Sequence, residues 1–149
     1  MDQQGFGLRS FRARVFRSLA RLLGVAALVA ATGCATTGSI TKDSAPEVKR
    51  EAVTERVNAR WAALIKGDID TAYTFLSPAS RTVTSLAAYK AEVRKGFRQA
   101  KIEKIECEPE TCKVTLTVIY DHPKMQGIPT LLEEHWVIDD GQFWYVWRS

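Results

Sequence analysis

Two side chains near the C-terminal end of the sequence could act as a general base, namely Glu134 and His135. A carboxylate or an imidazole takes up a proton near neutral pH when its surroundings tune its pKa. The stretch Thr130–Asp139 alternates, and this places Glu134 on one face with Leu132, Trp136 and Ile138. The other face, with Leu131, His135 and Val137, is apolar too, so alternation leaves open which face points inward.

No further chemistry converges on these two residues. The sequence contains no nucleophile motif, no glycine-rich phosphate loop and no run of metal ligands at a standard spacing. A lone histidine in an aromatic strand is more often packed or exposed than catalytic. We therefore expect no metal and no cofactor, and a domain that binds rather than catalyses, with Glu134 and His135 as the only catalytic candidates.

Cys107 and Cys112 flank four residues that separate two strand-like runs. A short turn places the flanking positions opposite each other, within reach of a disulfide, which is the default in an exported protein. Two alternatives remain. Metal binding would need His122 and His135, whose spacing matches no standard zinc pattern, and a redox-active pair would lack the usual two-residue spacing.

The positive charge of the chain lies at its start. The formal net charge is +4, and residues 1–33 carry five arginines against one aspartate, so the remainder is balanced. A basic patch is the electrostatic footprint of a nucleic-acid-binding protein. Because the folded part has no excess of positive charge, we expect no nucleic acid among its partners.

The first 33 residues have the three parts of a secretory signal peptide. Spaced arginines precede the apolar run Leu22–Ala31, and small residues follow it. Ten apolar residues extend about 15 Å as a helix, which is half of a hydrocarbon core and too short for a spanning anchor. This segment predicts export.

The segment Ala31-Thr32-Gly33-Cys34 resembles the bacterial lipobox, in which small residues precede a cysteine that is lipidated and becomes the mature N-terminus. The resemblance implies a palmitate-type acyl anchor at Cys34 and attachment to a membrane. Ala35 is not the aspartate that favours inner-membrane retention, so we expect the outer membrane, facing the periplasm. Residues 34–45 then read as the lipidated cysteine with a flexible tether, and residues 46–149 as the domain.

Helical periodicity accounts for the first part of the domain. Ser44 and Glu47 form a predicted capping box, and a helix then continues with apolar positions up to Gly67. Asp68 is expected to cap a second, short helix that Ser77-Pro78 stops. A third helix should begin after Ser85 and close at Gly96.

The second part changes to strand periodicity. Residues 98–107 and 113–120 form one predicted hairpin, and residues 130–139 and 142–148 form another through an Asp-Asp-Gly turn. Residues 122–129 contain two prolines and a glycine and are expected to be a loop. The fold class expected is α+β, with about three helices on one face of a curved four-stranded antiparallel sheet.

This order of elements resembles the NTF2-like cone-shaped fold, which is also seen in ketosteroid isomerase and SnoaL-like polyketide cyclases. The residues that carry the resemblance are Trp61, Lys66-Gly67-Asp68, Ala72-Tyr73, Phe75-Leu76-Ser77, Tyr89, Trp136, Asp140-Gly141 and Trp144-Tyr145. The resemblance implies an apolar cavity at the open end of the cone. Seven aromatic residues are candidates for its lining, although aromatic residues at helical or alternating spacing more often belong to the core alone. They are Trp61, Tyr73, Phe75, Tyr89, Tyr120, Trp136 and Trp144.

Two functions follow from these observations. The first is a membrane-anchored lipoprotein of the cell envelope whose domain is a non-catalytic module for a small apolar ligand or an envelope protein. The alternative, implied by the resemblance, is a small isomerase or cyclase acting on an apolar carbonyl compound, with a buried carboxylate near a tyrosine. The resemblance also implies a homodimer that pairs through the exposed face of the sheet.

Overall fold

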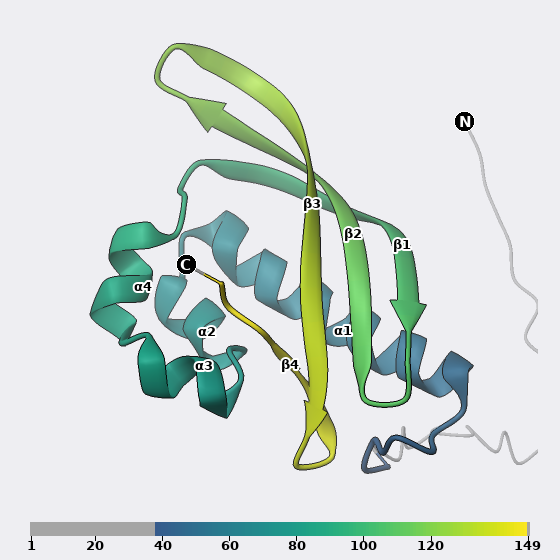
Figure 1. The fold of residues 1–149 in the computed structure, drawn as a ribbon. Coiled ribbons are helices and arrows are strands. Elements are labelled where there is room, and N and C mark those ends of the chain that lie inside the picture. Colours follow the sequence, from purple (N-terminus) through teal and green to yellow (C-terminus); the bar gives the residue numbers. More distant parts are fainter. Residues whose placement is uncertain (1–37, 149) are drawn as a thin grey trace, which may run out of the picture. The chain divides into compact units, whose positions relative to one another are not determined.

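The computed structural model describes residues 38–148. The predicted signal peptide, Cys34 and the first residues of the predicted tether lie outside this range. The elements are α1 (Pro46–Lys66), α2 (Ile69–Thr74), α3 (Pro78–Val83), α4 (Leu86–Glu92), β1 (Phe97–Cys107), β2 (Thr111–His122), β3 (Met125–Asp139) and β4 (Gln142–Tyr145). The helical segment precedes the sheet, as Figure 1 shows.

The expected fold class, an NTF2-like cone with about three N-terminal helices, is wrong. Within residues 38–148, four helices precede the four-stranded sheet, and among these four only α1, with 21 residues, is long. The helix that the sequence did not predict is α3. Ser77 caps it, because its Oγ accepts a hydrogen bond from the Ser80 amide at 3.0 Å, and Pro78 occupies the first turn. Proline lacks an N–H that the first turn would leave unpaired anyway, so Ser77-Pro78 starts a helix here instead of stopping one.

Helix α1 begins without the predicted capping box. The Ser44 Oγ accepts from the Thr41 amide at 2.9 Å, and no side chain caps the helix. The helix ends as predicted at Gly67, whose φ of +75° is in the left-handed region that glycine adopts freely. The apolar Ile65 is 37% exposed, whereas the charged residues Lys49 and Arg60 are buried.

The two other predicted caps are present. The amide of Thr71 donates to Asp68 Oδ1 at 3.1 Å at the start of α2, and the amide of Ala88 donates to Ser85 Oγ at 3.2 Å at the start of α4. Each cap satisfies one of the first-turn N–H groups that a helix leaves unpaired. These short helices therefore begin where their local sequence directs.

The sheet has the order β1-β2-β3-β4 with every pair antiparallel. Residues 122–129, predicted as a loop, belong largely to β3, because Ile128 pairs with Tyr120 and Pro129 with Ile119. Pro129 is tolerated there since β4 pairs only with residues 136–139, which leaves this half of β3 at an edge. Strand β4 ends at Tyr145 and not at the predicted position 148.

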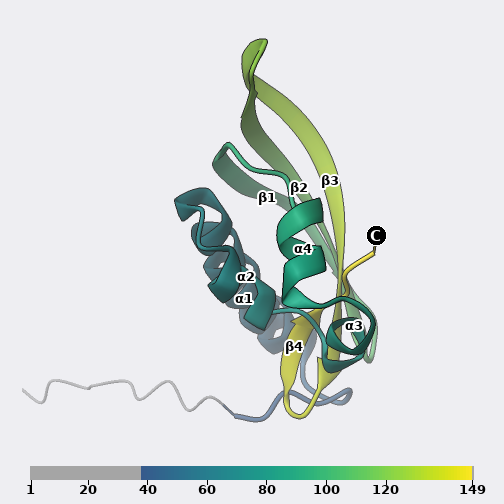
Figure 2. The same ribbon diagram turned by 90° about the vertical axis from the view of Figure 1, so that its left-hand side faces the viewer.

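The helices cover one face of the sheet, as Figures 1 and 2 show from two sides. The core between them contains Val53 and Val57 of α1 and the alternating residues Val114, Leu116 and Val118 of β2, all fully buried. The hydrophobic core lies entirely between residues 40 and 147, and residues 36–149 form one compact unit. This unit therefore carries its own core and can fold by itself.

The opposite face of the sheet carries half-buried or exposed side chains. On β2 these are Lys113, Thr115 and Thr117, and on β3 Leu131 is 66% exposed. The homodimer expected through this face remains a prediction.

The turn between β1 and β2 carries the disulfide that the spacing indicated. Cys107 and Cys112 are paired across the two strands, their Cα atoms are 4.1 Å apart, and their sulfur atoms are bonded. The bond closes a ring of few residues, so its effect on unfolded-state entropy is only about 2 kcal/mol. It fixes the register of this hairpin.

Part of the segment predicted as a flexible tether lies against the domain. The Ile40 amide donates to the Gly141 carbonyl oxygen at 2.8 Å, and the Ile40 side chain packs on the core. The buried Lys49 ammonium donates to the carbonyl oxygens of Lys42 at 2.5 Å and Pro109 at 2.8 Å. The folded unit thus begins several residues before position 46.

Strand β1 forms one edge of the sheet, since it pairs only with β2. Its exposed side chains alternate in sign of charge, with Lys101 bonded to Glu103 and Lys104 bonded to Glu106. Its register against β2 shifts twice, once between Phe97 and Gln99 and once between Ile102 and Lys104. The edge is therefore both charged and irregular.

Candidate functional site

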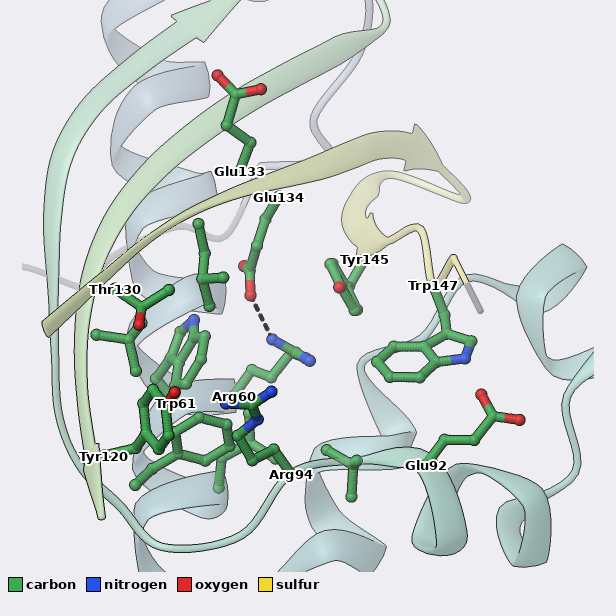
Figure 3. A pocket seen from close by; sticks show the side chains of 15 residues that line it. Arg60, Trp61, Glu92, Arg94, Tyr120, Thr130, Glu133, Glu134, Tyr145 and Trp147 are labelled. Carbon is green, nitrogen blue, oxygen red and sulfur yellow. Dashed lines mark hydrogen bonds and ion pairs between the residues drawn. The ribbon is translucent and has the colours of Figure 1, made fainter. Parts of the chain in front are cut away.

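A pocket of about 310 Å³ opens between α1, the residues that join α4 to β1, and the helix-facing side of β2 and β3 (Figure 3). Its wall is mainly apolar. The contributing side chains are Trp61 and Leu64 of α1, Phe97 of β1, Val118 of β2 and Leu132 of β3. This size lies at the lower end of the range for small-molecule sites.

Arg60 and Glu134 form a buried ion pair in the wall of this pocket. Arg60 Nη1 lies 2.5 Å from Glu134 Oε1, and each side chain is 3% exposed. The other carboxylate oxygen, Oε2, accepts a hydrogen bond from Trp136 Nε1 at 3.0 Å. Figure 3 shows Glu134 pointing from β3 toward Arg60.

Aromatic side chains surround the guanidinium of Arg60. Its Cζ lies 3.8 Å from the centroid of the Tyr145 ring, and its Nη2 donates to the Tyr89 hydroxyl at 3.3 Å. Burial lowers the pKa of Arg60, but Glu134, Tyr145 and Tyr89 outweigh this effect, and the pKa lies above its usual value. Arg60 therefore remains charged at any physiological pH.

The Tyr145 ring lies beside this pair and lines the pocket. Burial raises the pKa of Tyr145 to about 12, Arg60 opposes the rise, and Glu134 and Tyr89 add to it. The hydroxyl consequently stays protonated at neutral pH and can donate a hydrogen bond.

The buried ion pair shows which face of β3 points inward. Glu134 lies inside with Leu132 and Trp136, whereas His135 is half-buried on the other face, paired in register with Lys113. The structure therefore does not bring the two catalytic candidates together. Because both oxygens of Glu134 already accept hydrogen bonds from Arg60 and Trp136, this carboxylate is poorly placed to remove a proton from a substrate.

Two of the seven residues expected to line a cavity do so, namely Trp61 and Tyr120. Tyr89 and Trp136 are fully buried behind the wall, where they bond to Arg60 and Glu134. The Tyr73 hydroxyl donates to the Thr84 carbonyl oxygen at 2.8 Å and packs between helices.

Phe75 and Trp144 lie away from the pocket. Their rings pack on the guanidinium of Arg56, whose Cζ is 4.7 Å from the Phe75 centroid and 5.0 Å from the Trp144 centroid. Arg56 Nε also donates to the Phe143 carbonyl oxygen at 2.9 Å, on the outer edge of β4. These two aromatic residues close the edge of the sheet and do not line a cavity.

Four residues that line the pocket were not predicted as lining residues from the sequence, namely Arg60, Arg94, Tyr145 and Trp147. A signal for Arg60 was present. It follows Val57 by three residues and precedes Leu64 by four, so it lies on the apolar stripe of α1. A charged residue on such a stripe indicates a buried partner elsewhere in the fold.

Three N–H groups of pocket residues are buried and have no hydrogen-bond partner within the described part of the chain: Arg60 Nε, Trp61 Nε1 and Trp147 Nε1. For Arg60 the contact with the Tyr145 ring compensates in part. All three groups are donors.

Within residues 38–148, no helix is both long enough and apolar enough to cross a bilayer. In the same range, no three histidine, cysteine, aspartate or glutamate side chains are grouped closely enough to hold a metal ion.

Comparison with known proteins identifies no family for the chain. No protein-family model matches it, and no curated protein matches it. Among solved structures it is similar to a SEC-C motif containing protein from Rhodopseudomonas palustris, solved in solution, at 14% sequence identity and a TM-score of 0.49. The match covers 62% of this chain and 73% of the other protein. The solved structure is described as a SEC-C motif containing protein, and the NTF2-like resemblance inferred from the sequence finds no support among these comparisons.

Proposed function

We propose that this protein is a lipid-anchored component of the bacterial cell envelope whose folded domain binds a small, mainly apolar molecule without transforming it. The observation that carries the binding role is the pocket of about 310 Å³ with its apolar wall. Catalysis is disfavoured because Arg60 and Trp136 donate hydrogen bonds to both carboxylate oxygens of Glu134. A carboxylate held in this way gives the pocket a fixed polar wall and not a free base.

The anchor rests on the N-terminal segment, where an apolar run of signal-peptide length precedes Cys34. Acylation requires the thiol of Cys34. We expect Cys34→Ser to abolish incorporation of labelled palmitate in cells and to remove the mature protein from the outer-membrane fraction. Unchanged labelling in this variant would contradict the anchor, and Cys107→Ser with Cys112→Ser provides the control in which labelling should persist.

The binding role can be tested by filling the pocket. Leu132 lines the pocket, and Leu131, the residue before it in β3, projects from the opposite face of the sheet. We expect Leu132→Trp to weaken binding of octan-1-ol to the 36–149 domain by tenfold or more, since the larger side chain occupies the space. A tenfold loss corresponds to about 1.4 kcal/mol.

Leu131→Trp is the matched control and should bind octan-1-ol as the unchanged domain does. Binding is followed by the chemical shifts of backbone amides around the pocket, and the thermal midpoint of each variant shows that it is folded. Equal binding by both variants would place the octanol elsewhere and would reject the pocket as the ligand site.

A further inference from the structure

We propose that the natural ligand is an apolar carboxylate, with its hydrocarbon part inside the pocket and its carboxylate at the opening, bound by Arg94. This inference rests on the proposed binding function and adds the chemical class of the ligand. It follows from the position of Arg94 and from the charge of Glu134.

Arg94 lies at the opening of the pocket, because it lines the pocket and is exposed. Its Cζ is 4.6 Å from the centroid of the Tyr120 ring, and Figure 3 shows the side chain beside Tyr120 and Trp61. None of the ion pairs formed among residues 38–148 includes Arg94. A guanidinium oriented by an aromatic ring offers a fork of donors that matches a carboxylate.

The interior of the pocket would reject the same carboxylate. Glu134 is buried there, and its charge is already balanced by Arg60. A second carboxylate placed beside Glu134 would have one cation for two anions, in surroundings where charge repulsion is poorly screened. The head group of the ligand therefore stays at the opening, and the apolar wall of Trp61, Phe97 and Leu132 receives the tail.

Two exposed carboxylates that line the pocket oppose an anion, namely Glu92 and Glu133, and Glu133 is already paired with Lys113 at 3.7 Å. Figure 3 places Glu92 near Trp147, apart from Arg94. Glu92 is therefore the acid whose charge can be tested here. Its charge should weaken carboxylate binding modestly, since it is solvated and screened. Glu92→Gln is therefore expected to strengthen carboxylate binding, by about twofold. An amine-bearing ligand would show the opposite response.

The test compares octanoate with octan-1-ol, two probes that share a chain and differ in the head group. We expect the 36–149 domain, at pH 7 and low salt, to bind octanoate about tenfold more tightly than octan-1-ol. Arg94→Gln should remove this preference and leave octan-1-ol binding unchanged. Arg98→Gln is the control, because Arg98 is a nearby exposed arginine already paired with Asp121 and does not line the pocket.

The outcomes separate the two proposals. If octan-1-ol binds in the pocket but octanoate has no advantage, or if Arg94→Gln keeps the preference, the carboxylate inference is overturned and the binding function stands. Weaker octanoate binding by Glu92→Gln would also overturn it. If neither probe binds the unchanged domain, the proposed function itself fails.

Discussion

Replacing Arg60 by methionine should lower the free energy of unfolding of the domain by about 3–5 kcal/mol, as expected when one partner of a buried ion pair is removed. The substitution keeps an unbranched side chain of similar length on the apolar stripe of α1. It leaves the Glu134 carboxylate buried without its cation. The measurement is urea unfolding of the 36–149 domain, followed by tryptophan fluorescence.

The double variant Arg60→Met with Glu134→Leu separates the cost of an unpaired charge from the value of the pair. Removing both charges should restore most of the stability, because an apolar pair of similar volume needs no desolvation of ions. Arg56→Met is the control. This arginine is half-buried and bonds only to a backbone oxygen and aromatic rings, so its loss should cost about 1 kcal/mol. Equal effects of Arg60→Met and Arg56→Met would contradict the burial of the ion pair.

Trp136→Ala should destabilise the domain by about 3–5 kcal/mol, as large-to-small substitutions of buried aromatic residues do. The Trp136 side chain is fully buried, and its ring centroid lies 5.6 Å from that of Tyr145. Its removal leaves a cavity and also takes away the donor to Glu134 Oε2. The free energy of unfolding in urea measures the effect.

Trp144→Ala provides the comparison for Trp136→Ala. Trp144 lies eight positions later on the neighbouring strand, is only half-buried, and packs on Arg56 and Arg81 at the edge of the sheet. We expect a loss of about 1 kcal/mol there. If the two alanine variants were equally stable, Trp136 would not be the core residue that its burial indicates.

Local structure was predictable where one residue decides it. A short polar side chain can bond back to the first turn of a helix, and the sequence identified Asp68 and Ser85 in this role. Strand periodicity identified residues 113–120, and the alternating residues Val114, Leu116 and Val118 of this strand are buried. Ser77-Pro78 was misread because the same dipeptide can end one helix or begin the next, and only the surrounding chain decides between them.

The centre of the candidate site was not predictable in the same way. Arg60 and Glu134 are 74 positions apart in the sequence, and only the packing of α1 on β3 brings them together. The alternation of β3 could not orient Glu134, since both faces of the strand carry apolar residues. The disulfide was predictable because its two cysteines flank one short turn, so the pairing is a local property.

The NTF2-like resemblance failed for a physical reason. The residues that carried it are aromatic side chains at helical or alternating spacing, and any helix packed on a sheet needs such residues for its core. Tyr89 and Trp136 fill the core, and Trp144 covers an edge. Such a pattern indicates which side chains are buried, but it does not determine how the helices and strands are connected.

The charged, irregular edge strand β1 bears on how the protein behaves when many copies are crowded together. An open edge offers unpaired backbone groups that an identical strand from a neighbouring molecule could copy, which is how sheets extend into fibrils. Here an incoming strand would have to align with Lys101, Glu103, Lys104 and Glu106 and follow a backbone whose pleat is interrupted at Ile102 and Lys104. These features disfavour growth along this edge, which a flat and apolar edge strand would allow.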